Sequence, residues 1–113
     1  MESIKEKETY LIDLLCKLNK NKQIYCFKSF SDYYIYSKNF NGVTFCIRPI
    51  YDSGFSIYYK YVGAYANEGT FKLNEVFLNN PNYLKIKDML EIIECLKPID
   101  GVIKMLELDN KDI

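Results

Sequence analysis

The sequence predicts an α+β fold, in which a four-stranded antiparallel β-meander carries an N-terminal helix and C-terminal helices packed on one face. Residues 23–62 alternate apolar and polar side chains between short turn signals, as half-buried strands do. Within them, Asn41-Gly42 is the strongest two-residue hairpin signal. Apolar residues at helical spacing flank this stretch on both sides. Because 113 residues suffice for one hydrophobic core, we expect a single α+β domain over residues 1–113.

The first helix is predicted from its start signal. Ser3 followed by Glu6 forms a capping box, in which each side chain pairs with an otherwise unpaired backbone amide. An apolar stripe at helical spacing follows and should pack on the sheet: Ile4, Leu11, Leu14, Leu15 and Leu18. Lysines gather at the end of the helix, where cations suit the helix dipole.

The turns set the predicted register of the strands. If Asn41 and Gly42 are the two loop residues, Tyr36 lies opposite Ile47. By the same reasoning, Ser31-Asp32 turns a first strand, residues 24–30, back onto the second.

The next turn is predicted as a three-residue loop, Asp52-Ser53-Gly54, with Gly54 in the left-handed conformation. This loop places Arg48 opposite Tyr58 and Cys46 opposite Lys60. A two-residue loop would instead bury the Lys60 ammonium among aromatic rings, which would cost several kcal/mol in order of magnitude.

Two faces of different character follow from this register. The first is aromatic and aliphatic and needs a cover; it holds Tyr25, Phe27, Tyr34, Tyr36, Phe40, Val43, Phe45, Ile47, Phe55, Ile57, Tyr59 and Tyr61. The second mixes aliphatic residues, hydroxyls and cations without a carboxylate; it includes Ile24, Cys26, Lys28, Tyr33, Ile35, Arg48, Tyr58 and Lys60. The second face is therefore either a binding surface or a surface covered by a helix or by a second copy of the chain.

The C-terminal half predicts further helices. Residues 70–73 form either a plain connection or a short added hairpin. Asn80-Pro81 is a helix start, because asparagine caps and proline is preorganised at the first helical position. The apolar spacing continues this helix from Asn82 to Lys97, and Pro98 stops it. For Ile99 to Leu108 both helix and strand fit, and we choose helix.

Composition limits the chemistry. The chain has no histidine, which excludes a Ser-His-Asp or Cys-His nucleophile and removes the commonest general base near neutral pH. The four cysteines form no CxxC pair, so we expect reduced thiols and no metal site. No phosphate-binding glycine motif occurs. We therefore expect no enzymatic activity and no cofactor.

No apolar run approaches the length of a membrane span, and the charged N-terminal residues lack the core of a secretory signal. We expect a cytoplasmic protein that makes no membrane contact.

With enzymatic chemistry not expected, the class of protein that remains is a binding module. The candidate binding residues are those of the second face: Arg48, Tyr58, Lys60, Lys28 and Tyr33. Arg48 is the only arginine, and its guanidinium offers planar, two-pronged recognition that lysines cannot supply. We expect an intracellular, protein-binding inhibitor of the anti-defence or immunity type found in phages and mobile elements, with a homodimer also allowed by the pattern. The alternative is a protein that sequesters a nucleotide or other small molecule on the same basic, tyrosine-rich face; a nucleotide or nucleic acid ranks below a protein partner.

Overall fold

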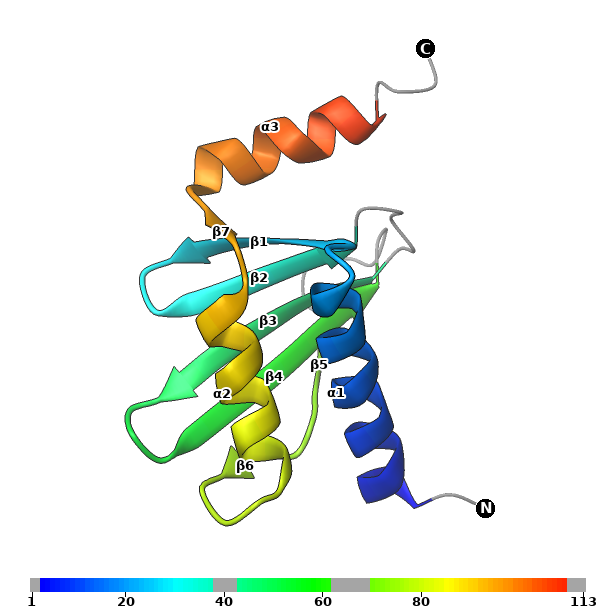
Figure 1. Cartoon of the computed structure of the whole chain (residues 1–113), viewed down its shortest axis with the longest axis vertical. Helices are drawn as coiled ribbons and strands as arrows, with labels where there is room; N and C mark the ends of the chain where they lie inside the picture. Colours follow the sequence, from blue (N-terminus) through cyan, green and yellow to red (C-terminus); the bar gives the residue numbers. More distant parts are fainter. Residues whose placement is uncertain (1–2, 38–42, 62–69, 110–113) are drawn as a thin grey trace.

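The computed structural model describes residues 3–37, 43–61 and 70–109. In these ranges it forms three α-helices and a seven-stranded sheet, which confirms the α+β class but adds strands to the four predicted (Figure 1). The elements are α1 (Ile4–Lys20), β1 (Ile24–Ser29), β2 (Asp32–Ser37), β3 (Val43–Ile50), β4 (Gly54–Tyr61), β5 (Thr70–Lys72), β6 (Val76–Phe77), α2 (Asn82–Ile92), β7 (Cys95–Leu96) and α3 (Pro98–Asp109). The sheet order is β5-β4-β3-β2-β1-β7, and β6 also pairs with β4.

Helix α1 starts where the capping signal predicts. The Ser3 hydroxyl oxygen accepts the backbone N–H of Glu6 at 3.1 Å. The buried face differs from the predicted stripe, because Ile12 and Leu15 are buried whereas Ile4 is 72% exposed. The helix therefore packs on the sheet through its second half.

Helices α1 and α2 lie side by side on one face of the sheet (Figure 1). The Asn82 side chain donates to the Thr9 hydroxyl at 3.0 Å, and the Lys85 ammonium lies 2.9 Å from the Asp13 carboxylate. Under these helices the core consists of Ile12, Leu15, Ile24, Cys26, Ile35, Ile47, Phe55, Ile57, Val76, Ile86, Met89 and Ile93. Each large aliphatic side chain buried there contributes roughly 1.5–3 kcal/mol.

The register between β2 and β3 differs from the prediction. Tyr33 lies opposite Ile47 and Ile35 opposite Phe45, three residues away from the predicted pairing of Tyr36 with Ile47. Because three is an odd number, every side chain of β1 and β2 lies on the opposite face of the sheet from the one predicted. The Asn41-Gly42 turn itself lies outside the described residues.

The shifted register is explained by which side chains fit into the core. The slip places the compact side chains of Cys26 and Ile35 under the helices, where they are 0% and 1% exposed. The larger side chains of Tyr34 and Tyr36 turn to the other face of the sheet.

Both described hairpin turns lie one residue earlier than predicted. Ser29 pairs with Asp32, which leaves Phe30-Ser31 as the loop, and Ile50 pairs with Gly54, which leaves residues 51–53. Gly54 is a strand residue, and a side chain there would overlap the backbone of β6, including the Val76 carbonyl oxygen. Glycine is needed there because another strand approaches closely, rather than for a left-handed turn.

Helix α2 ends at Ile92, five residues before the predicted end at Lys97. Ile93 is already extended, with φ −69° and ψ 135°, and its side chain is buried in the core. Cys95 and Leu96 then form β7, which pairs in parallel with β1. Pro98 begins α3 instead of ending α2.

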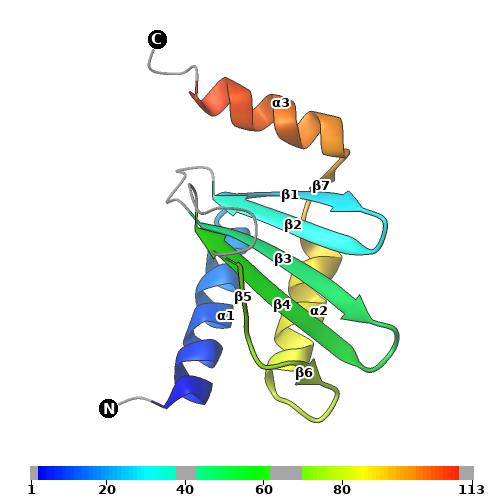
Figure 2. The same ribbon diagram turned by 180° about the vertical axis from the view of Figure 1, so that it is seen from behind.

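Helix α3 confirms the predicted helix over residues 99–108. It leaves the sheet at its β1 edge (Figures 1 and 2). Gly101 is buried against the ring of Phe27, and a Cβ at position 101 would lie 2.6 Å from Phe27 Cδ1. Among the described helices, none is long and apolar enough to span a membrane.

Candidate functional site on the open sheet face

The side of the sheet opposite α1 and α2 is crossed by neither of those helices (Figure 2). We call it the open face. The strand pairings place on it Tyr25, Phe27, Tyr34, Tyr36, Thr44, Cys46, Arg48, Ser56, Tyr58, Lys60, Thr70 and Lys72. The face is therefore rich in aromatic rings and hydroxyls and carries several cations.

Arg48 is held by a two-pronged ion pair. Its Nε donates to Asp32 Oδ1 at 3.0 Å, and an Nη nitrogen donates to Asp32 Oδ2 at 3.1 Å. This hydrogen bonding, together with the carboxylate charge, raises the pKa of Arg48, which stays protonated. The Arg48 side chain nevertheless remains 54% exposed. It is thus oriented without being removed from solvent.

Tyr58 lies between two cations. The Arg48 Cζ atom and the Lys72 ammonium are each 5.6 Å from the centre of its ring, within the range of a cation–π interaction. Lys72 is fixed in turn by the Glu75 carboxylate at 2.7 Å. Strands β3, β4 and β5 therefore build one ordered group, Arg48–Tyr58–Lys72, which we call the cation–tyrosine group.

An aromatic ladder occupies the β1 side of the same face. The ring of Phe27 is stacked with Tyr34 at 5.1 Å and with Tyr36 at 5.4 Å between ring centres, and the planes differ by 13° and 11°. Burial is the main cause that raises the pKa of both tyrosines, so their hydroxyls remain protonated hydrogen-bond donors.

The structure brings together three of the five predicted site residues. Arg48, Tyr58 and Lys60 share the open face, although Arg48 pairs across the strands with Ser56 and not with Tyr58. Lys28 and Tyr33 lie on the opposite, helix-covered face, where the Lys28 ammonium stands 5.0 Å above the Tyr33 ring. Their predicted place beside Arg48 was wrong because it depended on the register that slipped.

Sequence reasoning also missed residues of the open face. The sequence assigns Asp32 to a turn, so this face is predicted to have no carboxylate, whereas the structure places Asp32 in β2 beside Arg48. Phe27, Tyr34 and Tyr36 were assigned to the core. Lys72 could have been found through the alternative of an added hairpin at residues 70–73, since β5 occupies this position.

The described part of the chain holds no group of three metal-binding side chains. The cysteines are free thiols. Comparison with protein families, with curated proteins and with solved structures finds no match. The function must therefore be argued from the open face itself.

Proposed function

We propose that this chain is a non-enzymatic protein-binding module, acting as an inhibitor or adaptor, and that its open face contacts the partner with Arg48 at the centre. The observation that carries the proposal is the cation–tyrosine group. Arginine and tyrosine are the residue types that dominate binding energy at protein interfaces. Here both are ordered in the free protein, so binding loses little side-chain entropy.

The aromatic ladder favours a protein over a nucleic acid. Bases bind to single-strand platforms by stacking on free ring faces. Phe27 already stacks with Tyr34 and Tyr36, and cations approach Tyr58 from Arg48 and Lys72. The tyrosine hydroxyls are suited to hydrogen bonds with a protein surface, as in tyrosine-rich antibody loops.

The charges support the same choice. Arg48 is paired with Asp32, and Lys72 with Glu75. Each pair is neutral overall, so the open face attracts a polyanion less than its cations suggest. A polar, nearly balanced surface with aromatic anchors is typical of protein interfaces.

A nucleotide on this face is the alternative that the sequence left open. The cavity beside Tyr58, Lys60 and Tyr36 has a volume of about 280 Å³. Pockets for small ligands usually measure about 300–1,000 Å³, so this hollow is small for a nucleotide. We therefore rank the protein partner first.

The test uses capture of a partner from the source cell, followed by affinity measurement with purified proteins. Arg48→Ala and Tyr58→Ala should each weaken binding about thirtyfold, the effect of losing 2 kcal/mol at an interface centre. Lys28→Ala is the matched control, since it removes a cation from the opposite face. The proposal fails if both open-face variants bind like the wild type, or if Lys28→Ala weakens binding as much as they do.

A further inference from the structure

Two aromatic side chains, which we call the tip aromatics, lie at the tips of neighbouring hairpins. Phe30 is the first residue of the loop between β1 and β2, and Tyr51 is the first residue of the loop between β3 and β4. They are 100% and 98% exposed, the two highest values among the large hydrophobic side chains of the described residues. Both loops lie at the same end of the sheet (Figure 1). Because β1 and β3 are two strands apart, the two loops begin about 10 Å from each other.

The backbone at both positions is unfavourable for an aromatic residue. The φ angle is 56° at Phe30 and 46° at Tyr51, in the left-handed region that glycine usually supplies in tight hairpins. Lys22, the third described non-glycine residue with a positive φ, follows the end of helix α1, where this conformation is ordinary. The tip aromatics therefore cost stability, and their exposed rings gain no packing within the chain. Both facts are explained if the rings pack against another molecule.

The tip aromatics adjoin the cation–tyrosine group. Asp32, which holds the Arg48 guanidinium, is separated from Phe30 by one residue. Beside the second loop, the Leu78 N–H donates to the Ser53 carbonyl oxygen at 3.1 Å, and the Leu78 side chain is exposed. A contact surface that starts at Arg48 therefore continues onto the hairpin tips. Aromatic side chains beside an oriented arginine are the residue types that dominate binding energy at protein interfaces.

The charge of the loops argues against a membrane as the occupant. The two loops read Phe-Ser and Tyr-Asp-Ser, so Asp52 is their only charged residue. It is exposed and directly follows Tyr51. Membrane surfaces carry negative charge and are bound by apolar side chains together with lysine or arginine. A carboxylate beside one of the two rings opposes such binding.

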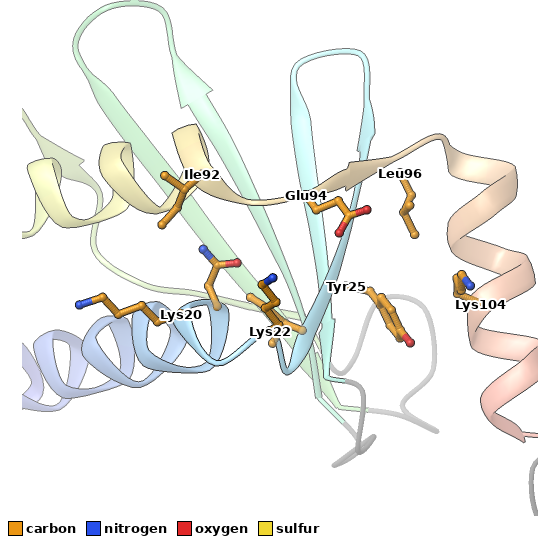
Figure 3. Close-up of a pocket in the computed structure, with 9 residues that line it drawn as sticks. Lys20, Lys22, Tyr25, Ile92, Glu94, Leu96 and Lys104 are labelled. Atoms are coloured by element: carbon orange, nitrogen blue, oxygen red, sulfur yellow. The ribbon is translucent and has the colours of Figure 1, made fainter.

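A second copy of the chain does not fit the tips either. A cavity of about 630 Å³ lies at the opposite end of β1, between the end of α1, the segment after α2, and α3 (Figure 3). Its lining includes Lys22, Glu94 and Lys104, and an inserted aromatic ring would remove water from these charged groups without replacing its hydrogen bonds. Such an insertion would also be a head-to-tail contact, which generates rings or filaments and not the two-fold dimer that is commonest among oligomers.

We propose that the partner is a protein with an apolar cleft, and that Phe30 and Tyr51 insert into this cleft while Arg48 contacts its rim. This inference rests on the proposed function, since it describes the partner of the same surface. Protruding tips require a concave surface, and clefts in proteins are lined mainly by hydrophobic and aromatic side chains. A module that fills a cleft excludes other ligands from it, which is consistent with an inhibitor.

Glycine variants separate binding from folding. Phe30→Gly and Tyr51→Gly should each raise the melting temperature of the free protein, because glycine relieves the left-handed backbone and the exposed rings stabilise nothing. Each should weaken affinity for the purified partner about tenfold or more. Tyr10→Ala, which removes an exposed aromatic residue from α1, is the matched control and should bind normally. A lower melting temperature in both glycine variants would show that the rings support the fold, against the proposal.

The absence of tryptophan from the chain provides a direct probe of insertion. In Phe30→Trp and Tyr51→Trp, addition of the purified partner should shift the indole emission to shorter wavelength and reduce its quenching by acrylamide, after subtraction of the wild-type complex. In Tyr10→Trp neither property should change. Vesicles of phosphatidylcholine and phosphatidylglycerol should leave the emission of all three variants unchanged.

The cleft is refuted if the indoles at positions 30 and 51 stay accessible to acrylamide in the complex, if both glycine variants bind like the wild type, or if vesicles alone shift the emission. Weak binding by Arg48→Ala together with normal binding by both glycine variants refutes the cleft but keeps the proposed function. Capture of no partner, or normal binding by both Arg48→Ala and Tyr58→Ala, refutes the proposed function and the cleft together.

Discussion

Arg48 and Asp32 form two nearly equal hydrogen bonds, of 3.0 and 3.1 Å, across strands β3 and β2. The guanidinium is half exposed, whereas the Asp32 side chain is only 16% exposed. An ion pair with one partner in solvent contributes about 0–1 kcal/mol to stability. Its main effect is to fix the orientation of the arginine on the open face.

Arg48→Lys should therefore separate stability from binding. Lysine keeps the charge but loses the two-pronged geometry, so the free energy of unfolding should fall by less than about 1 kcal/mol. Affinity for the protein partner should fall about tenfold. Urea unfolding and affinity measurement check the two values. A loss of stability above about 2 kcal/mol would show that the pair is chiefly structural.

Gly101→Ala should destabilise the chain although alanine favours helices. The new Cβ would lie 2.6 Å from Phe27 Cδ1, and stacking with Tyr34 and Tyr36 limits how far that ring can move. We expect a loss of about 1–3 kcal/mol in urea unfolding. The double variant Gly101→Ala with Phe27→Leu should recover part of that loss. If alanine alone stabilises the protein, α3 does not pack against Phe27 as described.

Oxidation should link β1 to β7. Cys26 and Cys95 are opposite each other in the parallel pair, and their Sγ atoms are 3.7 Å apart. Neighbouring strands place Cα atoms within disulfide reach. Diamide, which accepts two electrons and two protons, should convert these two thiols to one disulfide with the loss of two hydrogens.

The disulfide should raise the free energy of unfolding by about 2–4 kcal/mol, because it closes a long loop. Peptide mapping by mass spectrometry identifies the bond. Cys46→Ser should leave its formation unchanged, and Cys26→Ser should abolish it. Another cysteine pairing in the folded protein would contradict the β1–β7 register.

Stability should fall in alkaline solution. Burial, and secondarily Cys95, raises the pKa of the Cys26 thiol far above its ordinary value of 9.0. Burial also raises the pKa of Tyr36 above 10.0. The folded chain then keeps protons that the unfolded chain loses, so stability from these groups is full below about pH 9 and decreases as the pH rises further.

Each such group contributes a slope approaching about 1.4 kcal/mol per pH unit above the unfolded pKa. Urea unfolding between about pH 8 and about pH 10.5 measures the decrease. Cys26→Val, which removes the thiol while keeping an apolar side chain, should reduce the slope. A slope identical to that of the wild type would show that Cys26 titrates normally in the folded chain.

The parts of the fold that local signals determine were predictable. Ser3 marks the start of α1, and the alternation in β3 and β4 correctly separates Ile47 from Arg48. The pairing of these two strands is offset by two residues from the prediction, and because two is even, each side chain keeps its face. That is why Arg48, Tyr58 and Lys60 were assigned correctly to one surface.

The register between β2 and β3 and the end of α2 depended on contacts between distant segments. The odd slip between β2 and β3 follows from which side chains fit beneath the helices, and no turn motif encodes that. Helical spacing continues through Ile93, yet pairing of Cys95 with β1 overrides it. Tertiary contacts of this kind routinely outweigh local propensity. The sequence therefore identified the strands of the site but assigned Lys28 and Tyr33 to the wrong side.

The pairing of β7 with β1 also bears on the order of events during protein synthesis. Cys26 and Cys95 are 69 residues apart in the sequence, so β1 leaves the ribosome long before its parallel neighbour exists. Until β7 has been made, the outer edge of β1 has unpaired backbone groups, and such edge strands can pair with other chains. Because closing a loop over this sequence separation is slow, β7 pairs with β1 late in folding. Newly made chains are therefore most prone to associate with one another before Cys95 has been synthesised.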